Sequence, residues 1–110
     1  MGHTGYLGEL EQMVLLAVLQ LGNDAYGTNV MDELKQRVGR NVSRGALYVT
    51  VDRLEEKGML TSRLGDPTPR RGGRLKRYLK VSRAGVAALR KSRAAWMQLW
   101  EGLDSVLGQP

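Results

Sequence analysis

The middle of the chain carries the feature that most constrains its fold, a short capped helix that runs directly into a basic hairpin. Ser43 is a good N-cap because its side-chain oxygen can accept a bond from a free helix amide, and Gly58 is a typical helix terminator. These limits predict a helix over residues 44–57. A strand over 59–64, a loop rich in Gly and Pro, and an alternating strand over 74–81 are predicted to follow.

Helices are predicted on both sides of this unit. Apolar residues at helical spacing predict a first helix from Leu7 to Leu21 and a second that ends at Gly39, and Ser82 is expected to cap a last helix. Three helices, a hairpin (the wing) and a last helix form a winged helix-turn-helix, so the predicted fold is mainly α (α+β). We expect a disordered N-terminus (1–6), a winged helix-turn-helix DNA-binding domain (7–81) and a C-terminal dimerisation helix (82–107).

Positive charge is concentrated in one block of the sequence. Between Arg70 and Arg93 there are ten Lys or Arg residues and no acid, whereas the rest of the chain holds seven basic and eleven acidic residues. The net charge of +6 alone would fit a nucleic acid, an anionic membrane or mere solubility. A solvated charged face usually mixes signs, so the block favours a surface that binds a polyanion.

The composition argues against catalysis. Cysteine is absent and His3 is the only histidine, which excludes disulfides, thiolate metal sites and a His-based catalytic dyad. No phosphate-cradling glycine loop precedes a helix. We therefore expect no enzyme activity, no metal and no cofactor. Because no apolar run approaches the roughly 18 residues needed to span a bilayer, we also expect a cytoplasmic protein without a membrane partner.

Five residues around the start of the 44–57 helix are candidates for DNA contact. Ser43 and Arg44 lie where free amides and the positive end of the helix dipole favour phosphate, and Arg44 can also grip a guanine edge. Gly45 would let the backbone approach the duplex, or would serve helix packing. The Tyr48 hydroxyl can reach a phosphate or sugar, or the residue can pack against the wing. Val49 can meet a thymine methyl.

The wing adds four candidates for contact with the DNA backbone: Arg70, Arg71, Arg74 and Lys76. If several neutralise phosphates, binding should weaken by about 0.9 log units per contact per log of salt concentration; the arginines at the tip could instead enter a minor groove. Lys76 and Arg77 alternate along a strand, so both are not expected to reach DNA together. The acids of the preceding helix are expected to face solvent or to pair within it: Asp52, Glu55 and Glu56 with Arg53 and Lys57.

The last predicted helix has a stripe too apolar to leave in water. Trp96, Trp100, Leu103 and Leu107 follow i, i+4, i+7, i+11 spacing. The stripe could cover the core of its own chain, but it lies beyond a finished fold, and the first helix offers an equally apolar partner. We therefore favour a symmetric homodimer that buries both, with interface or ligand-binding residues Trp96, Trp100, Leu103 and Leu15.

These segments resemble the PadR family of transcriptional regulators over roughly residues 7–90. The resemblance rests on three stretches: 15–19 leading to 25–27, 45–48 through 53–58, and 72–78 with 81–85. Its most specific part is Gly-Ala-Leu-Tyr at 45–48 followed by Arg-Leu-Glu-Glu-Lys-Gly at 53–58. Tyr-Val-Thr-Val at 48–51 replaces the family's common Tyr-Pro-Thr-Leu, a departure that bears on the operator sequence.

The resemblance implies a homodimeric repressor that binds a palindromic operator on double-stranded DNA and is released by a small ligand. The single short C-terminal helix resembles the compact subgroup, in some of whose members a tryptophan at the place of Trp96 stacks on planar aromatic drugs between the subunits. The alternative is that Trp96 and Trp100 only fill the dimer core. A function of another class, a winged helix that binds protein and not DNA, does not require a basic wing.

Overall fold

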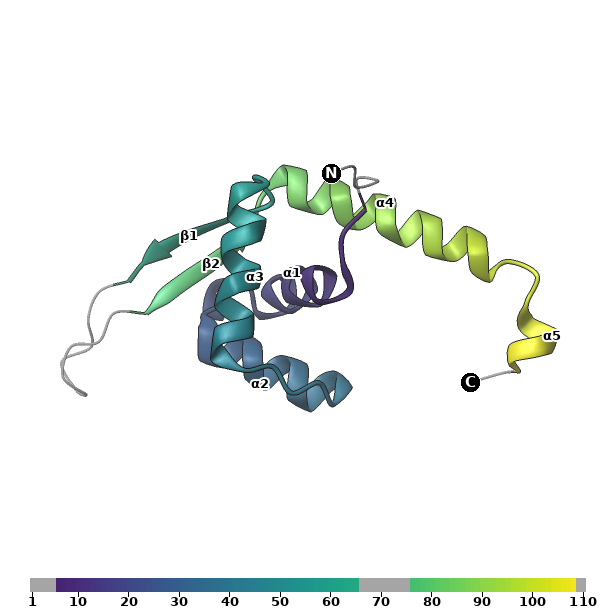
Figure 1. Ribbon diagram of the computed structural model, residues 1–110, viewed down its shortest axis with the longest axis horizontal. Helices are drawn as coiled ribbons and strands as arrows, with labels where there is room; N and C mark the ends of the chain where they lie inside the picture. The colour runs from purple at the N-terminus through teal and green to yellow at the C-terminus, as the bar shows by residue number, and fades with distance from the viewer. Residues whose placement is uncertain (1–5, 66–75, 109–110) are drawn as a thin grey trace.

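The computed structural model describes residues 6–65 and 76–108 and has the predicted winged helix-turn-helix architecture (Figure 1). Its elements are α1 (Glu9–Leu21), a short 3₁₀ turn η1 (Gly22–Asp24), α2 (Gly27–Val38), α3 (Arg44–Glu56), β1 (Leu60–Leu64), β2 (Arg77–Val81), α4 (Arg83–Trp100) and α5 (Asp104–Leu107). The prediction of a mainly α (α+β) fold is confirmed. Across this described part, no helix is long and apolar enough to cross a membrane.

Helix α1 lies at the centre of the core, because it packs against α2, α3, β2 and α4. Its residues Val14 and Leu15 are fully buried, together with Leu47 and Leu54 of α3 and Leu60 of β1. Burial of each such side chain contributes about 1.5–3 kcal/mol relative to exposure. An aliphatic core therefore holds one side of α3 and the base of the wing on a single scaffold.

Both predicted serine caps are confirmed. The Ser43 hydroxyl oxygen accepts from the Ala46 amide at 3.1 Å, and the Ser82 hydroxyl oxygen accepts from the Gly85 amide at 3.1 Å. The Ser82 hydroxyl also donates to the carbonyl of Gly58 at 2.6 Å, which ties the start of α4 to the turn between α3 and β1. Because such a cap is worth about 1 kcal/mol, the starts of α3 and α4 are fixed locally.

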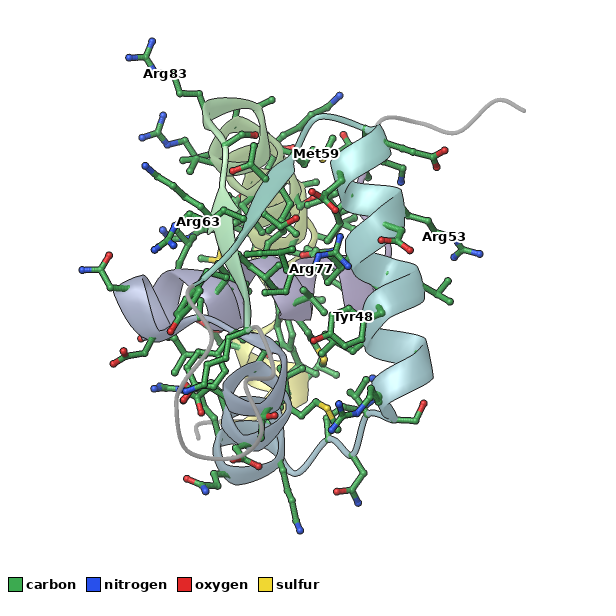
Figure 2. The ribbon with its side chains drawn as sticks, turned by 90° about the vertical axis from the view of Figure 1, so that its left-hand side faces the viewer. Tyr48, Arg53, Met59, Arg63, Arg77 and Arg83 are labelled. Atoms are coloured by element: carbon green, nitrogen blue, oxygen red, sulfur yellow. The ribbon has the colours of Figure 1, made fainter. Side chains whose placement is uncertain are left out.

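The wing is an antiparallel hairpin in which Leu60 pairs with Val81 and Leu64 with Arg77. Paired residues share a face of a sheet, and Figure 2 shows Arg77 on the face turned to α3, with Arg63 on the opposite face. Strand β2 begins at Arg77, later than predicted, and Lys76 precedes it. Residues 74 and 75 of the predicted strand lie outside the described residues.

The C-terminal region corrects the prediction of one helix to residue 107. Helix α4 ends at Trp100, Gly102 follows with a left-handed φ of 80°, and α5 is a separate helix of four residues. Apolar spacing continues through this break, so the pattern alone suggested one helix, although glycine tolerates a positive φ where other residues do not. Figure 1 shows the second half of α4 and α5 extending away from the rest of the fold.

The segment predicted to be disordered, residues 1–6, is described only at its last residue. Residues 1–5 lie outside the described residues. Tyr6, the last residue of that segment, places its ring centroid 4.9 Å from Lys91 Nζ of α4. Leu7, directly after it, is buried in the core. The packed domain therefore includes Tyr6.

Candidate nucleic-acid interface

The first turns of α3 present a surface that makes few contacts with the rest of the chain. Arg44 is exposed and has no hydrogen bond or ion pair through its side chain to another described residue. A methyl group added at Gly45 would meet no heavy atom within 4 Å, so this glycine does not serve helix packing. Val49 is 52% exposed. These three positions are open to a ligand as large as a DNA duplex, and Ser43 lies exposed beside them as the cap.

Tyr48 is a packing residue in this structure. It is half-buried, and its hydroxyl lies so close to α2 that a Cβ added at Gly27 would be 2.1 Å from the oxygen. The guanidinium of Arg77 lies 5.6 Å from the Tyr48 ring centroid on the side of the wing. Of the two roles expected for Tyr48, packing is the one observed, and its main partner is the start of α2.

Lys76 lies directly before β2, at the outer end of the described hairpin and beside the start of α2. Its Nζ lies 4.4 Å from the centroid of the Tyr26 ring, and Tyr26 in turn makes an edge contact with Tyr78 at 5.4 Å. No carboxylate in the described part of the chain pairs with Lys76, so an aromatic ring positions its charge without neutralising it. The other wing candidates, Arg70, Arg71 and Arg74, lie outside the described residues.

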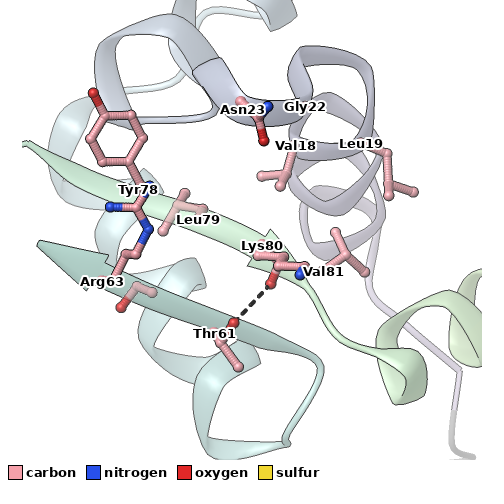
Figure 3. Close-up of a pocket in the computed structure, with 11 residues that line it drawn as sticks. Val18, Leu19, Gly22, Asn23, Thr61, Arg63, Tyr78, Leu79, Lys80 and Val81 are labelled. Carbon is pink, nitrogen blue, oxygen red and sulfur yellow. Dashed lines mark hydrogen bonds between the residues drawn. The ribbon is translucent and has the colours of Figure 1, made fainter. Parts of the chain in front are cut away.

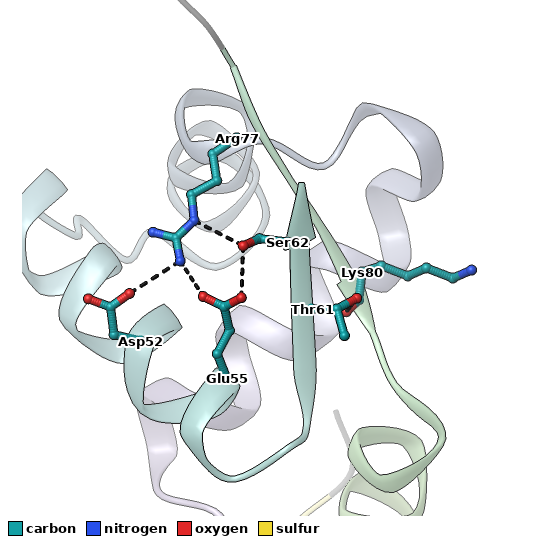
Figure 4. A network of polar contacts seen from close by, with 6 residues as sticks. All are labelled: Asp52, Glu55, Thr61, Ser62, Arg77 and Lys80. Atoms are coloured by element: carbon teal, nitrogen blue, oxygen red, sulfur yellow. Dashed lines mark hydrogen bonds and ion pairs between the residues drawn. The ribbon is translucent and has the colours of Figure 1, made fainter. Parts of the chain in front are cut away.

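Arg77 occupies the opposite face and pairs with acids of α3 (Figure 4). It forms ion pairs with Asp52, at 3.2 Å, and with Glu55. Its Nε also donates to Ser62 Oγ at 3.2 Å, and the Ser62 hydroxyl donates to Glu55 at 2.8 Å. Lys76 and Arg77 thus lie on different faces, as predicted. Asp52 is exposed, as expected, but the expected pairing of Asp52 and Glu55 within their own helix is wrong, because both acids pair with Arg77 of the wing.

Lys57 also has a distant partner. Its Nζ lies 2.7 Å from Glu11 Oε2 of α1, and Glu11 accepts a further bond from the Gly8 amide at 2.9 Å. Burial acts to raise the pKa of Glu11, but these hydrogen bonds and the charges of Lys57 and Arg53 outweigh it and hold that pKa below its ordinary value. The pair joins the end of α3 to the start of α1. The sequence pattern indicated only partners within α3 for Lys57 and therefore did not predict it.

The predicted interface residues on the C-terminal side fall into two groups. The tryptophans and leucines of the stripe are exposed and form, with Leu99, the C-terminal apolar patch: Trp96, Leu99, Trp100, Leu103 and Leu107. Leu15 was assigned to the same interface and is fully buried in the core, so that assignment is wrong. Its neighbours Leu16 and Leu19 are each 49% exposed on α1. Both faces of α1 are apolar, and the periodicity did not distinguish the buried one.

The described surface includes two hollows next to α1. One of about 790 Å³ lies between α1 and α4, with Leu16, Trp96 and the buried Ser92 in its walls. The other, of about 450 Å³, lies between the end of α1 and the outer face of the wing and is shown in Figure 3. There Arg63 stacks on Tyr78 at 4.8 Å from the ring centroid. Neither hollow holds a metal-binding cluster, since no group of three or more His, Cys, Asp or Glu is suitably placed in residues 6–65 and 76–108.

Comparison with known proteins gives relatives along most of the chain. It is 39% identical over 79 residues to Transcriptional regulator Rv3488 of Mycobacterium tuberculosis, a match that covers 70% of this chain and 67% of that protein. It is 27% identical over 99 residues to uncharacterized protein X of Lysinibacillus sphaericus, covering 88% and 86%. A solved structure of a PadR family transcriptional regulator from Eggerthella lenta is 28% identical with a TM-score of 0.68, covering 93% of this chain and 88% of that one.

A model of a protein family also matches most of the winged helix. The model of the Transcriptional regulator PadR-like family matches residues 15–91, from α1 into α4. That span contains the free start of α3, the described part of the wing and the Arg77 contacts. The chain therefore belongs to the PadR family of transcriptional regulators, whose members bind DNA and are not enzymes.

Proposed function

We propose that this chain is a homodimeric repressor that binds a palindromic operator through residues 43–49 and its basic wing. The single observation that carries the proposal is the open start of α3, where Arg44, Gly45 and Val49 are exposed around a capped helix N-terminus. Such an end can enter a major groove, and its free amides and dipole favour phosphate. In this proposal residues 7–81 form the DNA-binding domain and 82–107 the dimerisation segment.

Direct binding tests the DNA part of the proposal. A labelled duplex from upstream of the protein's own gene should shift at nanomolar protein in modest salt. The triple variant Arg44→Gln, Arg70→Gln, Arg71→Gln should bind far more weakly, and each lost phosphate contact should lower the salt slope by about 0.9. The matched control is Lys35→Gln, an exposed lysine in the last turn of α2. In vitro transcription from the bound fragment should fall as the protein is added.

Two results would contradict DNA binding as the function. Folded wild-type protein that shifts none of the upstream fragments would rule out an operator beside its own gene. Unchanged binding of a protein partner by the triple variant, together with no DNA binding, would favour the protein-interaction module that a winged helix can also form.

The homodimer is supported by the C-terminal apolar patch. Trp96, Trp100 and Leu103 are exposed in the single chain, and so are Leu16 and Leu19 of α1. Leu16 and Trp96 line the same hollow between α1 and α4, and monomeric soluble proteins rarely expose large contiguous apolar patches. A second copy related by a two-fold axis would cover it and would present two α3 helices to the two half-sites of a palindrome.

A planar aromatic effector is the finer part of the proposal. Trp96 is 55% exposed and lies beside the hollow between α1 and α4, where an aromatic molecule could stack on its ring. A planar dye should quench tryptophan fluorescence, and Trp96→Ala should abolish the quenching while the protein remains a dimer. Trp100→Phe, which keeps Trp96, is the matched control. Quenching that survives Trp96→Ala would instead favour tryptophans that only fill the dimer core.

A further inference from the structure

We infer that Arg77 is a positioning residue that fixes the angle of the wing against α3, and that operator affinity depends on it although it does not touch DNA. The inference rests on the proposed binding of DNA by α3 and the wing. Arg77 belongs to the basic block of the sequence, where a cation would ordinarily be assigned to phosphate contact. The contacts of its guanidinium indicate another role.

Three of the five N–H donors of Arg77 are in use, and Nη1 has no hydrogen bond to another described residue. Its Nη2 donates to Asp52 at 3.2 Å and also to Glu55, while its Nε donates to Ser62 at 3.2 Å. The Tyr48 ring lies on another side, 5.6 Å from the guanidinium carbon. A DNA phosphate could reach Nε or Nη2 only by displacing these partners. At Nη1 it would lie close to the carboxylates of Asp52 and Glu55, whose negative charge repels it. Arg77 is therefore poorly suited to DNA contact in this conformation.

The network lies where apolar packing of the wing ends. At its base, Leu60 and Leu79 are 2% and 4% exposed, whereas Leu64, paired with Arg77 toward the tip, is 64% exposed. The outer edge of β2 is held by the Leu79 amide, which donates to the carbonyl of Ala25 at 2.8 Å. Beyond that point, core burial no longer fixes the wing.

Among the described residues, every hydrogen bond and ion pair that joins α3 to the two strands belongs to this network. Ser62 connects its parts, because it accepts from Arg77 and donates to Glu55. A planar guanidinium can bridge the two carboxylates and the hydroxyl at once, which a single lysine ammonium cannot match in geometry. The network thus fixes how far the outer end of the described hairpin, at Leu64 and Arg77, stands from α3.

Charge compensation adds to the same effect. The Asp52 side chain is 68% exposed on α3, where a DNA backbone would approach, and Glu55 lies one turn further on. Arg77 offsets part of this negative charge. Without Arg77, two uncompensated carboxylates would repel each other and the phosphates, and the wing would lose its tie to α3.

The first experiment reads the position of the wing without DNA. The chain has no cysteine, so Gln36→Cys on α2 and Arg63→Cys on the outer face of the wing can be spin-labelled specifically. Labelled protein is diluted into excess unlabelled protein, so that one copy per dimer carries the pair. The distance distribution from double electron–electron resonance should be narrow in the parent and broad with Arg77→Gln. Glu55→Gln should broaden the distance distribution similarly. If Arg77→Gln does not fold, this second variant tests whether the network positions the wing.

The second experiment reads affinity and salt dependence on the upstream duplex. Arg77→Gln should weaken binding on the order of tenfold, because charge-assisted hydrogen bonds are lost. Its salt slope should change by less than the roughly 0.9 expected for one phosphate contact. Lys76→Gln, the matched control one residue away, should lower the slope by about 0.9. The charge swap Arg77→Glu with Glu55→Arg should restore most of the affinity and the narrow distance distribution.

Two outcomes would overturn the inference. A slope that falls by about 0.9 in Arg77→Gln would make Arg77 a phosphate contact, and an unchanged distance distribution in both single variants would remove its positioning role. If the wild type binds no DNA, the proposed function fails, yet the spin-label experiment still decides whether Arg77 positions the wing.

Discussion

Helices α3 and α4 both pack against α1 but expose opposite chemistry. On α3 the outward residues are mostly polar or small, including Arg44, Gly45 and Asp52. On the second half of α4, Trp96 and Leu99 are 55% and 73% exposed. Exposed apolar area costs about 25 cal/mol per Å² relative to burial, whereas charged groups are well solvated. The exposed face of α3 is therefore compatible with water, while the proposed dimer would remove the apolar face of α4 from water.

Their buried sides differ as well. The Thr50 hydroxyl of α3 donates to the carbonyl of Ala46 at 2.9 Å. The Ser92 hydroxyl of α4 is buried without a hydrogen-bond partner among the described residues. Buried polar groups are normally satisfied. The buried hydroxyl of α3 is thus satisfied within the chain, whereas the buried hydroxyl of α4 has no partner among the described residues.

The strongest test of this contrast places a charge in the C-terminal apolar patch. Trp100→Glu should raise the dimer dissociation constant on the order of a thousandfold, because a buried aromatic anchor would be replaced by a carboxylate. Sedimentation velocity over a concentration series measures this. The same acid at exposed Arg83, at the start of α4, should leave the dimer intact. If Trp100→Glu dimerises like the wild type, the patch is not the interface.

A smaller effect is expected where α3 meets α2. Gly27→Ala should destabilise the fold by about 1–3 kcal/mol, because the new methyl would collide with the Tyr48 hydroxyl. Gly45→Ala is the matched control: its methyl meets open space, and the better helix former should add about 0.5–1 kcal/mol. Urea unfolding measures both. Equal effects at the two glycines would mean that Tyr48 is not held against α2.

The two buried hydroxyls give a finer test. Thr50→Val should cost about 1 kcal/mol, since it removes a satisfied hydrogen bond. Ser92→Ala should cost nothing or stabilise by up to about 1 kcal/mol, because it removes a buried polar atom that has no partner. A large loss with Ser92→Ala would show that the serine finds its partner across the dimer, which sedimentation of that variant would then reveal.

The smallest predicted effect is the acid sensitivity of the link between α1 and α3. The pKa of Glu11 is lower in the folded chain than its ordinary value of 4.5. Its contribution to stability is therefore complete above pH 4.5 and is lost as pH falls through the lower folded pKa. Because Lys57 is partly exposed and screened, we expect less than about 1 kcal/mol. Thermal melts should show a shallower acid decline in Glu11→Gln than in wild type, and parallel curves would contradict the pairing.

Local patterns were sufficient for much of the site. Ser43 and Ser82 were predicted as caps because a serine before an apolar helix has few other roles, and both make the expected bonds. Alternation along the wing correctly separated Lys76 from Arg77. The apolar residues of the C-terminal segment were predicted to leave the core of their own chain, and they are exposed, although they lie on two helices and not on one. In each case the prediction depended only on residues a few positions apart in the sequence.

Other features depended on contacts between distant segments. The spacing on α1 did not distinguish Leu15, which faces the core, from Leu16, which does not. Arg77 and Lys57 were not expected to reach Glu55 and Glu11, because those acids come close only when α3 packs against the wing and α1.

The sequence by itself determined the order of elements, the caps and the chemistry of each exposed face, because helix and strand periods and capping act over a few residues. Only the tertiary structure decided which apolar face of α1 enters the core, where α4 breaks, and that Arg77 of β2 pairs with acids of α3. Those outcomes depend on how close separate elements lie, and periodicity along one element carries no information about that distance.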